Sequence, residues 1–304
     1  MNKKNISKSE TKSFRTGNVL WVLVMPDNQQ ARNLLQGAVD LHVHTAPDIV
    51  ARKFDDLELA RESRSWGLSA LVIKSHLGET AARAGLAAHS VQGIEVYGGI
   101  VLNNSVGGLN PAAVEISLKL GGKIVWMPTL DSANHRSCIG NSGGISIFEE
   151  KERLRPEVKD ILRLIREYGA SLSTGHLSFR ETSVLIEAAR EEKIRAVLLT
   201  HPEFWITFLP LEKQRHLLCE NLFFERCFYS STLEKGKYTP FQQSVEWIKN
   251  LGPESSILSS DLGQANNPAP AEGLEIMIGD LLEAGVDFYS IRRMISENPS
   301  YILE

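Results

Sequence analysis

The segment "VDLHVHTAPD" (39–48) carries two histidines, His42 and His44, separated by one residue at the end of a short apolar run. Side chains at positions i and i+2 of a β-strand point to the same face, so both imidazoles are expected to project together. Imidazole nitrogens are common ligands of divalent transition metals. The spacing therefore indicates a metal site at the end of a strand.

Single histidines and one aspartate recur at the ends of other apolar runs. The set comprises His76 in "SALVIKSH", His176 in "ASLSTGH", His201 in "RAVLLTH" and Asp261 in "SSILSSD". Imidazoles with a carboxylate and without thiolates suit Zn²⁺, Mn²⁺, Ni²⁺ or Fe²⁺. We therefore expect one or two divalent ions, with zinc as the first choice, if the fold brings these strand ends together.

The apolar runs alternate with amphipathic stretches, which is the pattern of parallel strands joined by helices in an α/β fold. Strands are expected over residues 37–44, 69–76, 94–102, 122–129, 170–176, 195–201, 221–228 and 255–261. Eight strands, each followed by a helix, indicate a (β/α)8 TIM-type barrel, in which the carboxyl ends of the strands meet on one rim. A doubly wound open sheet is the structural alternative.

The chain is expected to hold a polar N-terminal extension over residues 1–30, beginning with a mobile tail, and one barrel domain over residues 31–304. The apolar stretch 19–25 is too short and too late for a signal peptide, and no small-residue cleavage site follows it. No run approaches the ~18 consecutive apolar residues of a transmembrane helix.

The composition limits which partners and which cellular location are expected. A net charge of -4 and a pI near 6.1 leave no basic surplus for nucleic acid or an anionic membrane. Cys138, Cys219 and Cys227 show no CxxC spacing, which favours a reducing, cytoplasmic location over a disulfide framework. The expected partner is a small-molecule substrate, and association into a homo-oligomer is left open.

The connection over 130–155 is long for a compact domain, and such connections serve either as binding loops or as tolerated insertions. Its segment "DSANHRS" supplies Arg136, and Arg52 follows the histidine pair. These cations could bind a substrate carboxylate or phosphate, or could be solvated surface charges. We take Arg136, together with His76 and Asn103 at the ends of two strands, as the candidates for substrate binding.

The order of a histidine pair, two single histidines and an aspartate resembles the amidohydrolase superfamily of metal-dependent hydrolases, from about residue 37 to the end. The closing "ENPSYIL" is similar to an "NPA"-type stretch near the last helix of many members. The resemblance implies that His42 and His44 hold the more buried metal. It also implies that His176 and His201 hold a second metal or orient the substrate. Asp261 would bind metal and act as the proton shuttle, and we take His201 and Asp261 as the catalytic pair.

One departure concerns the ligand that bridges two metals. Binuclear members usually carry a carboxylated lysine or a glutamate on strand four, but strand four here ends "WMPTLD". Asp131 just beyond it is one substitute. Lys74 on strand two is a possible bridge as well, because "IKSH" directs Lys74 and His76 to the same interior face, and D-aminoacylase-like relatives take a bridging ligand from strand two. Lys74 could instead pair with a substrate anion or with Asp261, so the number of metals stays open.

The seventh strand, "NLFFERCF", places Glu225 and Cys227 on one face and Phe224 and Arg226 on the other. Nothing in the sequence marks an activated thiol, so core packing is the expected role of Cys227.

The expected function is hydrolysis of an amide, lactone or ester bond in a small molecule, with Asp261 transferring the proton of a metal-activated water. Three alternatives are kept. One is a phosphoesterase of the polymerase-and-histidinol-phosphatase type, which also opens with such a histidine pair. The others are a metal-dependent decarboxylase and a metal-binding barrel without catalysis. No residue pattern identifies the natural substrate.

Overall fold

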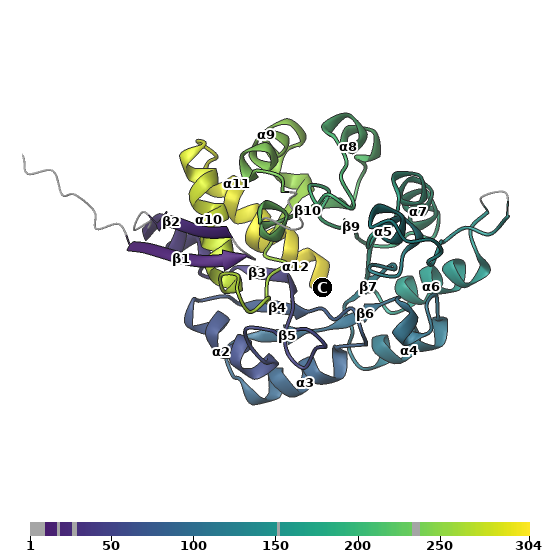
Figure 1. Cartoon of the computed structure of the whole chain (residues 1–304). Coiled ribbons are helices and arrows are strands. Elements are labelled where there is room, and N and C mark those ends of the chain that lie inside the picture. The colour runs from purple at the N-terminus through teal and green to yellow at the C-terminus, as the bar shows by residue number, and fades with distance from the viewer. Residues whose placement is uncertain (1–9, 17–18, 26–28, 151–152, 233–237) are drawn as a thin grey trace, which may run out of the picture.

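Parallel strands surround the centre of the protein (Figure 1). The computed structural model describes residues 10–16, 19–25, 29–150, 153–232 and 238–304. In chain order the segments are β3 (Val39–Val43), β4 (Ala70–Ile73), β5 (Glu95–Tyr97) continued by β6 (Gly99–Val101), β7 (Ile124–Trp126), β8 (Ser171–Ser173), β9 (Val197–Leu199), β10 (Leu222–Cys227) and β11 (Ser256–Ser259). Each lies within one of the eight apolar runs, which confirms the strand predictions.

The ring of strands closes between β3 and β11. Sheet β3–β4–β5 continues into the sheet from β6 to β11, because β6 follows β5 after a single residue. At the other seam, the amide of Asp261 donates to the carbonyl of His42 (2.8 Å), and the amide of His44 donates to that of Leu262 (2.8 Å). The predicted (β/α)8 barrel is therefore confirmed, and the open doubly wound sheet is excluded.

Helices cover the outside of the barrel (Figure 1). They are α1 (Gln29–Leu35), α2 (Asp56–Ser65), α3 (Ala81–Ser90), α4 (Pro111–Lys119), α6 (Pro156–Glu167), α7 (Phe179–Glu191), α8 (Leu211–Leu217), α9 (Phe241–Leu251), α10 (Pro270–Glu283) and α11 (Phe288–Arg292). Their apolar faces pack on outward-facing strand residues such as Leu71, Val125 and Leu172. Full burial of each such side chain contributes ~1.5–3 kcal/mol.

The last helix, α12 (Asn298–Leu303), covers the amino end of the barrel. Ile302 and Leu303 join the inward-facing cluster of Val39, Leu41 and Trp126. The hydroxyl of Ser171, at the start of β8, donates to the carbonyl of Ile302 (2.9 Å). Figure 1 shows the C-terminus at the middle of the ring. The carboxyl ends of the strands are on the opposite side.

Two segments differ from the sequence expectations. Strands β1 (Glu10–Thr16) and β2 (Val19–Met25) pair in antiparallel fashion, so the expected mobile tail is a strand from Glu10 on, whereas its first nine residues lie outside the described residues. The long connection over 130–155 contains a short helix, α5 (Ala133–Cys138), in which the hydroxyl of Ser132 accepts the amide of His135 (3.0 Å). A helix of fewer than two turns has no apolar periodicity for a sequence to reveal.

A β-bulge in β3 changes which side chains face inward. Val39 and Leu41 belong to the interior cluster, yet His42 also faces the interior, because the pairing register shifts between Asp40 and Val43. The carboxylate of Asp40 stabilises this irregularity. Its Oδ1 accepts the amide of His42 (3.2 Å) and the amide of Ser260 (3.0 Å), which follows β11.

Asp40→Asn is expected to remove a pH dependence from the stability of the metal-free protein. Burial raises the pKa of Asp40 from 3.8 to about 7, although hydrogen bonds from Ser260 and His42 oppose the rise. Between these values the folded state holds a proton that the unfolded state has lost, so the free energy of unfolding falls as pH rises from ~4 to ~7. Asparagine keeps an acceptor for both amides without the charge. Urea unfolding across this window should therefore show the variant gaining stability relative to wild type, and parallel curves would contradict the assignment.

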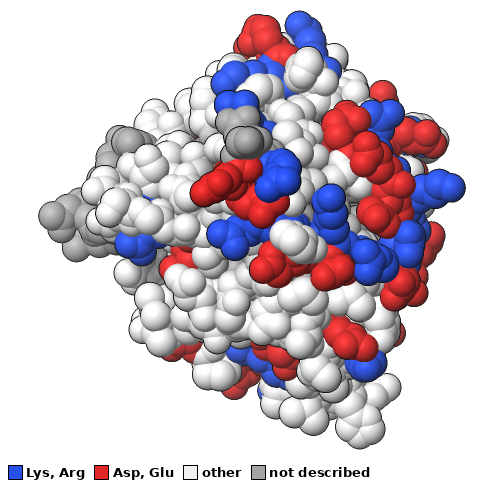
Figure 2. All heavy atoms as spheres, turned by 90° about the vertical axis from the view of Figure 1, so that its right-hand side faces the viewer, with Lys and Arg blue, Asp and Glu red and all other residues white. Residues whose placement is uncertain are grey.

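Charged side chains of both signs alternate on the face turned toward the viewer in Figure 2. Exposed ion pairs such as Arg166–Glu192 (2.8 Å) and Arg163–Asp160 (3.2 Å) join residues on the outer helices. Neither sign dominates this face, in keeping with the small net charge of the chain. Among the described residues, no helix is both long and apolar enough to span a membrane.

Candidate metal centre

Three donor groups converge at the carboxyl ends of β3 and β11. Asp261 Oδ1 lies 3.0 Å from His42 Nε2 and 3.1 Å from His44 Nε2. The two histidines are buried, and the Asp261 side chain is 10% exposed. Metal–ligand bonds of ~2.0–2.2 Å place neighbouring donors of a tetrahedral or octahedral ion about 3.0–3.5 Å apart. The donors therefore fit a divalent transition metal.

The backbone near these donors holds unusual conformations. Asp261 has φ 52° and His201 has φ 26°, in a region that non-glycine residues rarely occupy. Such residues cost ~1–3 kcal/mol each and gather at functional sites. Gly263, with φ +136°, lets the chain after Asp261 pass close to β3, because a Cβ there would lie 1.8 Å from the His44 carbonyl oxygen. The backbone is therefore locally strained at Asp261 and His201, close to the donor groups.

Charge coupling sets the protonation of His42 and Asp261. Burial alone would lower the pKa of His42, but Asp261 and Glu225 outweigh it and raise that pKa to about 9. Burial would raise the pKa of Asp261, yet the His42 charge and hydrogen bonds from both histidines hold it well below its usual range. Asp261 is therefore a carboxylate at neutral pH. Burial lowers the pKa of His44 to about 4, despite the nearby Asp261, which leaves His44 neutral and able to bind a metal.

Lys74 lies at the floor of the site, on the interior face predicted for it. Its Nζ is 2.9 Å from His42 Nε2 and 5.7 Å from the centre of the Trp126 ring. Burial lowers the pKa of Lys74, although Asp261 and Glu225 oppose the change. A less basic amine is the form that carboxylation of a lysine requires.

Strand four supplies no bridging ligand. Trp126 fills its interior position, among the inward-facing residues of the barrel. Asp131 does not reach inward, because its Oδ2 accepts the amide of Asn104 (2.9 Å) away from the cavity. Of the two bridging candidates, the structure brings only Lys74 to the metal donors.

Further histidines line the cavity beside Asp261: His76, His135, His176 and His201. The rings of His176 and His201 are 4.9 Å apart, and His135 Nδ1 lies 2.7 Å from His176 Nδ1. Burial lowers the pKa of His201 to about 3 and places those of His76 and His176 well below the usual value. These three imidazoles are neutral, which suits metal binding or hydrogen bonding to a substrate.

The cavity above the donors measures about 210 Å³. Its walls include Val50, Leu130 and the aromatic rings of Phe204 and Tyr229, and Arg52 also lines it. Arg52 is paired with Asp48, Nη2 to Oδ2 at 2.7 Å. The volume falls below the ~300–1,000 Å³ of typical drug-sized ligand sites, so it suits a small substrate.

The three candidates for substrate binding have different positions. His76 lines the cavity, whereas Asn103 and Arg136 do not. Asn103 supports the neighbouring loops: its Nδ2 donates to the His76 carbonyl (3.0 Å) and its Oδ1 accepts the amide of Thr129 (2.9 Å). Arg136 donates to the carbonyl of Ser142 (3.0 Å) in its own loop.

His135, the neighbour of Arg136, reaches the cavity instead. Adjacent residues of an α-helix point about 100° apart, so α5 turns one side chain inward and the next one away.

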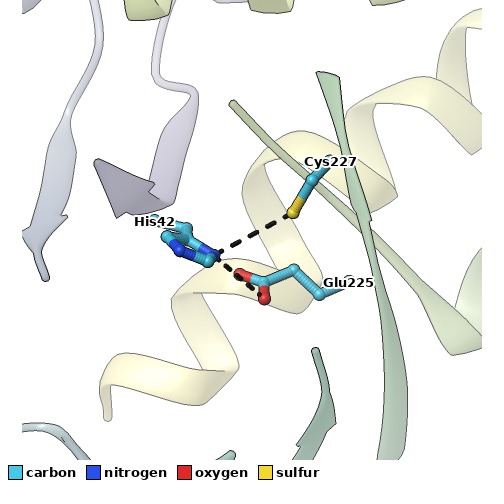
Figure 3. Close-up of side chains that lie close together, drawn as sticks. All are labelled: His42, Glu225 and Cys227. Carbon is cyan, nitrogen blue, oxygen red and sulfur yellow. Dashed lines mark hydrogen bonds and ion pairs between the residues drawn. The ribbon is translucent and has the colours of Figure 1, made fainter. Parts of the chain in front are cut away.

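The seventh strand contributes a site residue that the sequence analysis missed. As expected, Phe224 faces the helices, and Glu225 and Cys227 share the inner face of β10. Glu225 Oε2 lies 3.3 Å from His42 Nδ1, and Cys227 Sγ lies 4.0 Å from the same atom (Figure 3). A carboxylate on the inward face of a buried strand was the available signal.

The fold is shared with solved structures of low sequence identity. An amidohydrolase from Pseudomonas aeruginosa gives a TM-score of 0.66 at 13% identity, covering 90% of this chain and 98% of that one. A mutant PTE-like lactonase of Deinococcus radiodurans gives 0.58 at 14%, covering 90% and 97%. A 2,6-dihydroxybenzoate decarboxylase complexed with 2,6-dihydroxybenzoate gives 0.53 at 11%, covering 88% and 99%. These similarities show that the barrel fold of this protein is shared with all three enzymes.

Sequence comparison assigns the chain to a family. No curated protein matches it. Residues 37–225 match the profile described as "Family of unknown function (DUF6282)". The matched segment runs from β3 to β10 and includes His42, His44 and Glu225. Because the match covers more than half of the sequence, this protein belongs to DUF6282, a family of unknown function.

Proposed function

We propose that this protein is a metal-dependent hydrolase that cleaves an amide, lactone or ester bond in a small molecule. The observation that carries the proposal is the convergence of His42 and His44 on the Asp261 carboxylate beside a cavity. A divalent metal such as Zn²⁺ would lower the pKa of a bound water towards ~7 and polarise the scissile carbonyl. The fold shared with an amidohydrolase and a lactonase supports this chemistry.

Asp261 and His201 have different roles in the proposed reaction. Asp261, held as a carboxylate, accepts a proton from the attacking water and returns it to the leaving group. The hydroxyl of Thr207 donates to the His201 carbonyl (2.8 Å), so it accepts the proton of His201 Nδ1 (2.9 Å). The Nε2 of His201 is then the unprotonated nitrogen. That nitrogen can bind a second metal or accept a hydrogen bond from the substrate.

The cavity favours a substrate that combines an anionic group with an apolar one. Lys74 and several imidazoles line it, and Asp261 is the acidic group among its lining residues. Arg52 also lines the cavity, and a substrate carboxylate or phosphate would share its guanidinium with Asp48, whose Oδ2 lies 2.7 Å from Nη2. Val50 and Phe204 offer apolar contacts beside these groups.

The test is turnover by metal-loaded protein on matched esters, lactones and amides, each prepared in an anionic and a neutral form. We expect metal-dependent hydrolysis of at least one bond class and faster reaction of its anionic form. If the loaded protein turns over no bond type, the hydrolase proposal fails and a metal-binding barrel without catalysis becomes the better account.

A decarboxylase is the second candidate. Among the described residues, both clusters of possible metal donors contain His42, and neither includes His176 or His201, which suits a single ion. The structural similarity to a 2,6-dihydroxybenzoate decarboxylase adds support. Release of CO₂ from hydroxybenzoic acids, measured with the same metal-loaded protein, would favour this reaction over hydrolysis. The phosphoesterase alternative has less support. Enzymes of the polymerase-and-histidinol-phosphatase type normally have a distorted seven-stranded barrel, whereas the barrel described here has eight strands, with β5 and β6 counted as one.

A further inference from the structure

The two ring nitrogens of His42 face different partners. Nε2 faces Asp261 Oδ1 at 3.0 Å and Lys74 Nζ at 2.9 Å. Nδ1 faces the other side, toward Glu225 and Cys227 (Figure 3). His44 differs, because its buried Nδ1 has no hydrogen-bond partner among the described residues. Of the two histidines, therefore, only His42 has a carboxylate beside its Nδ1 among the described residues.

Glu225 reaches His42 across the interior of the barrel. It comes from β10, whereas His42 comes from β3, and both side chains are 0% exposed. Its Oε2 contacts His42 Nδ1, and its Oε1 has no hydrogen-bond partner among the described residues. Removing a carboxylate from water is strongly unfavourable unless the carboxylate has a partner, and apolar packing alone would not require one here. The placement of Glu225 therefore indicates a role that acts through His42.

We propose that Glu225 is a positioning residue for the metal centre. It accepts the Nδ1 proton of His42, fixes the tautomer whose Nε2 is free, and holds that nitrogen toward Asp261 and His44. A carboxylate in this position also makes the imidazole a stronger ligand. This inference rests on the proposed metal site. It adds a residue of β10 to a site whose three donors come from the ends of β3 and β11.

The alternative is that His42 Nδ1, Glu225 and Cys227 hold an ion themselves, because their donor atoms lie within 4.8 Å of one another. An ion on each ring nitrogen would require His42 to lose both ring protons and Cys227 to ionise. A hydrogen bond from Nδ1 to Glu225 requires neither change. The geometry therefore favours the positioning role.

The experiment compares Zn²⁺ and Co²⁺ affinity of wild type, Glu225→Gln, Glu225→Asp and Cys227→Ala by competition with a chelator. We expect Glu225→Gln to weaken metal binding ~10–100-fold, in the range found for such partners of ligating histidines. Glu225→Asp should recover part of the loss, since it keeps a carboxylate. Cys227→Ala is the matched control on the same strand face and should change the affinity less than about threefold by the same reasoning. Circular dichroism of the metal-free variants checks their folding.

Nuclear magnetic resonance supplies a second readout, which does not depend on metal affinity. The His42 Nδ1 proton of the wild type should give a downfield signal, and in Glu225→Gln that signal should move upfield. Equal metal affinity in wild type and Glu225→Gln, or an unprotonated His42 Nδ1, would overturn the inference while leaving the metal site intact. A thiolate-to-cobalt absorption band that disappears in Cys227→Ala would overturn it in favour of an ion at Nδ1. A wild-type protein that binds neither metal would overturn the metal site as well.

Discussion

Asp261→Asn is expected to lower kcat by ~10²–10⁴-fold on any substrate that the metal-loaded protein hydrolyses. Asparagine keeps the size of the side chain and one oxygen near His42 Nε2 and His44 Nε2, but it cannot accept and return a proton. Because His42 and His44 hold the pKa of Asp261 well below its usual range, its protonation should lower kcat only at low pH, and that acidic limb should be lost as well. Steady-state kinetics across pH, with the metal content of each sample measured in parallel, separates lost proton transfer from lost metal.

Asp131→Asn is the matched control, because the Asp131 carboxylate accepts the Asn104 amide (2.9 Å) and does not line the cavity. Its kcat should stay close to that of wild type. If Asp261→Asn keeps its metal and a kcat within about threefold of wild type, well short of general acid–base effects, Asp261 is not the proton carrier.

Arg226→Met is expected to destabilise the fold by ~3–5 kcal/mol. Arg226 lies on the outer face of β10 and is 0% exposed. Its Nη1 donates to Glu203 Oε1 and to Gln214 Oε1, the latter at 2.7 Å. Methionine fills much of the same space but leaves the buried Glu203 without its cation. Urea unfolding at neutral pH, with the slope against denaturant compared between variants, measures the loss.

Two controls distinguish the effect of breaking the buried ion pair from the effect of losing any arginine. Arg226→Met combined with Glu203→Gln should recover much of the stability, because no unpaired charge is then buried. Arg190→Met removes a surface pair with Glu187, whose side chains are 57% and 66% exposed, and should change stability by less than about 1 kcal/mol. If Arg226→Met alone lowers the free energy of unfolding by less than about 1 kcal/mol, breaking the buried Arg226–Glu203 pair is not strongly destabilising and the prediction is wrong.

The sequence was sufficient for the parts of the fold that depend on local pattern. Each barrel strand lies in a continuous apolar run, because a strand covered on both sides needs apolar residues at every position. Alternation also placed Lys74 and His76 correctly on the inner face of their strand, and it separated Glu225 from Phe224 on β10.

Other features depend on contacts between distant segments, which local pattern does not contain. The β3 bulge requires the Asp40 carboxylate to meet the Ser260 amide, 220 residues away. The role of Asn103 depends on its contacts with two other loops, and the short helix α5 decides that His135, and not Arg136, reaches the cavity. Alternation predicted the face of Glu225 but could not predict that His42 lies opposite it.

Metal content of the protein purified without a histidine tag, measured by inductively coupled plasma mass spectrometry beside a His42→Ala/His44→Ala variant, tests the central claim most directly. The account predicts at least one equivalent of a divalent transition metal in the wild type and its loss in the double variant, because it assigns both imidazoles as ligands. A second equivalent in the wild type would identify Lys74 as the bridging residue to examine next. A wild type that holds no metal, even after zinc and manganese are supplied, would contradict the account.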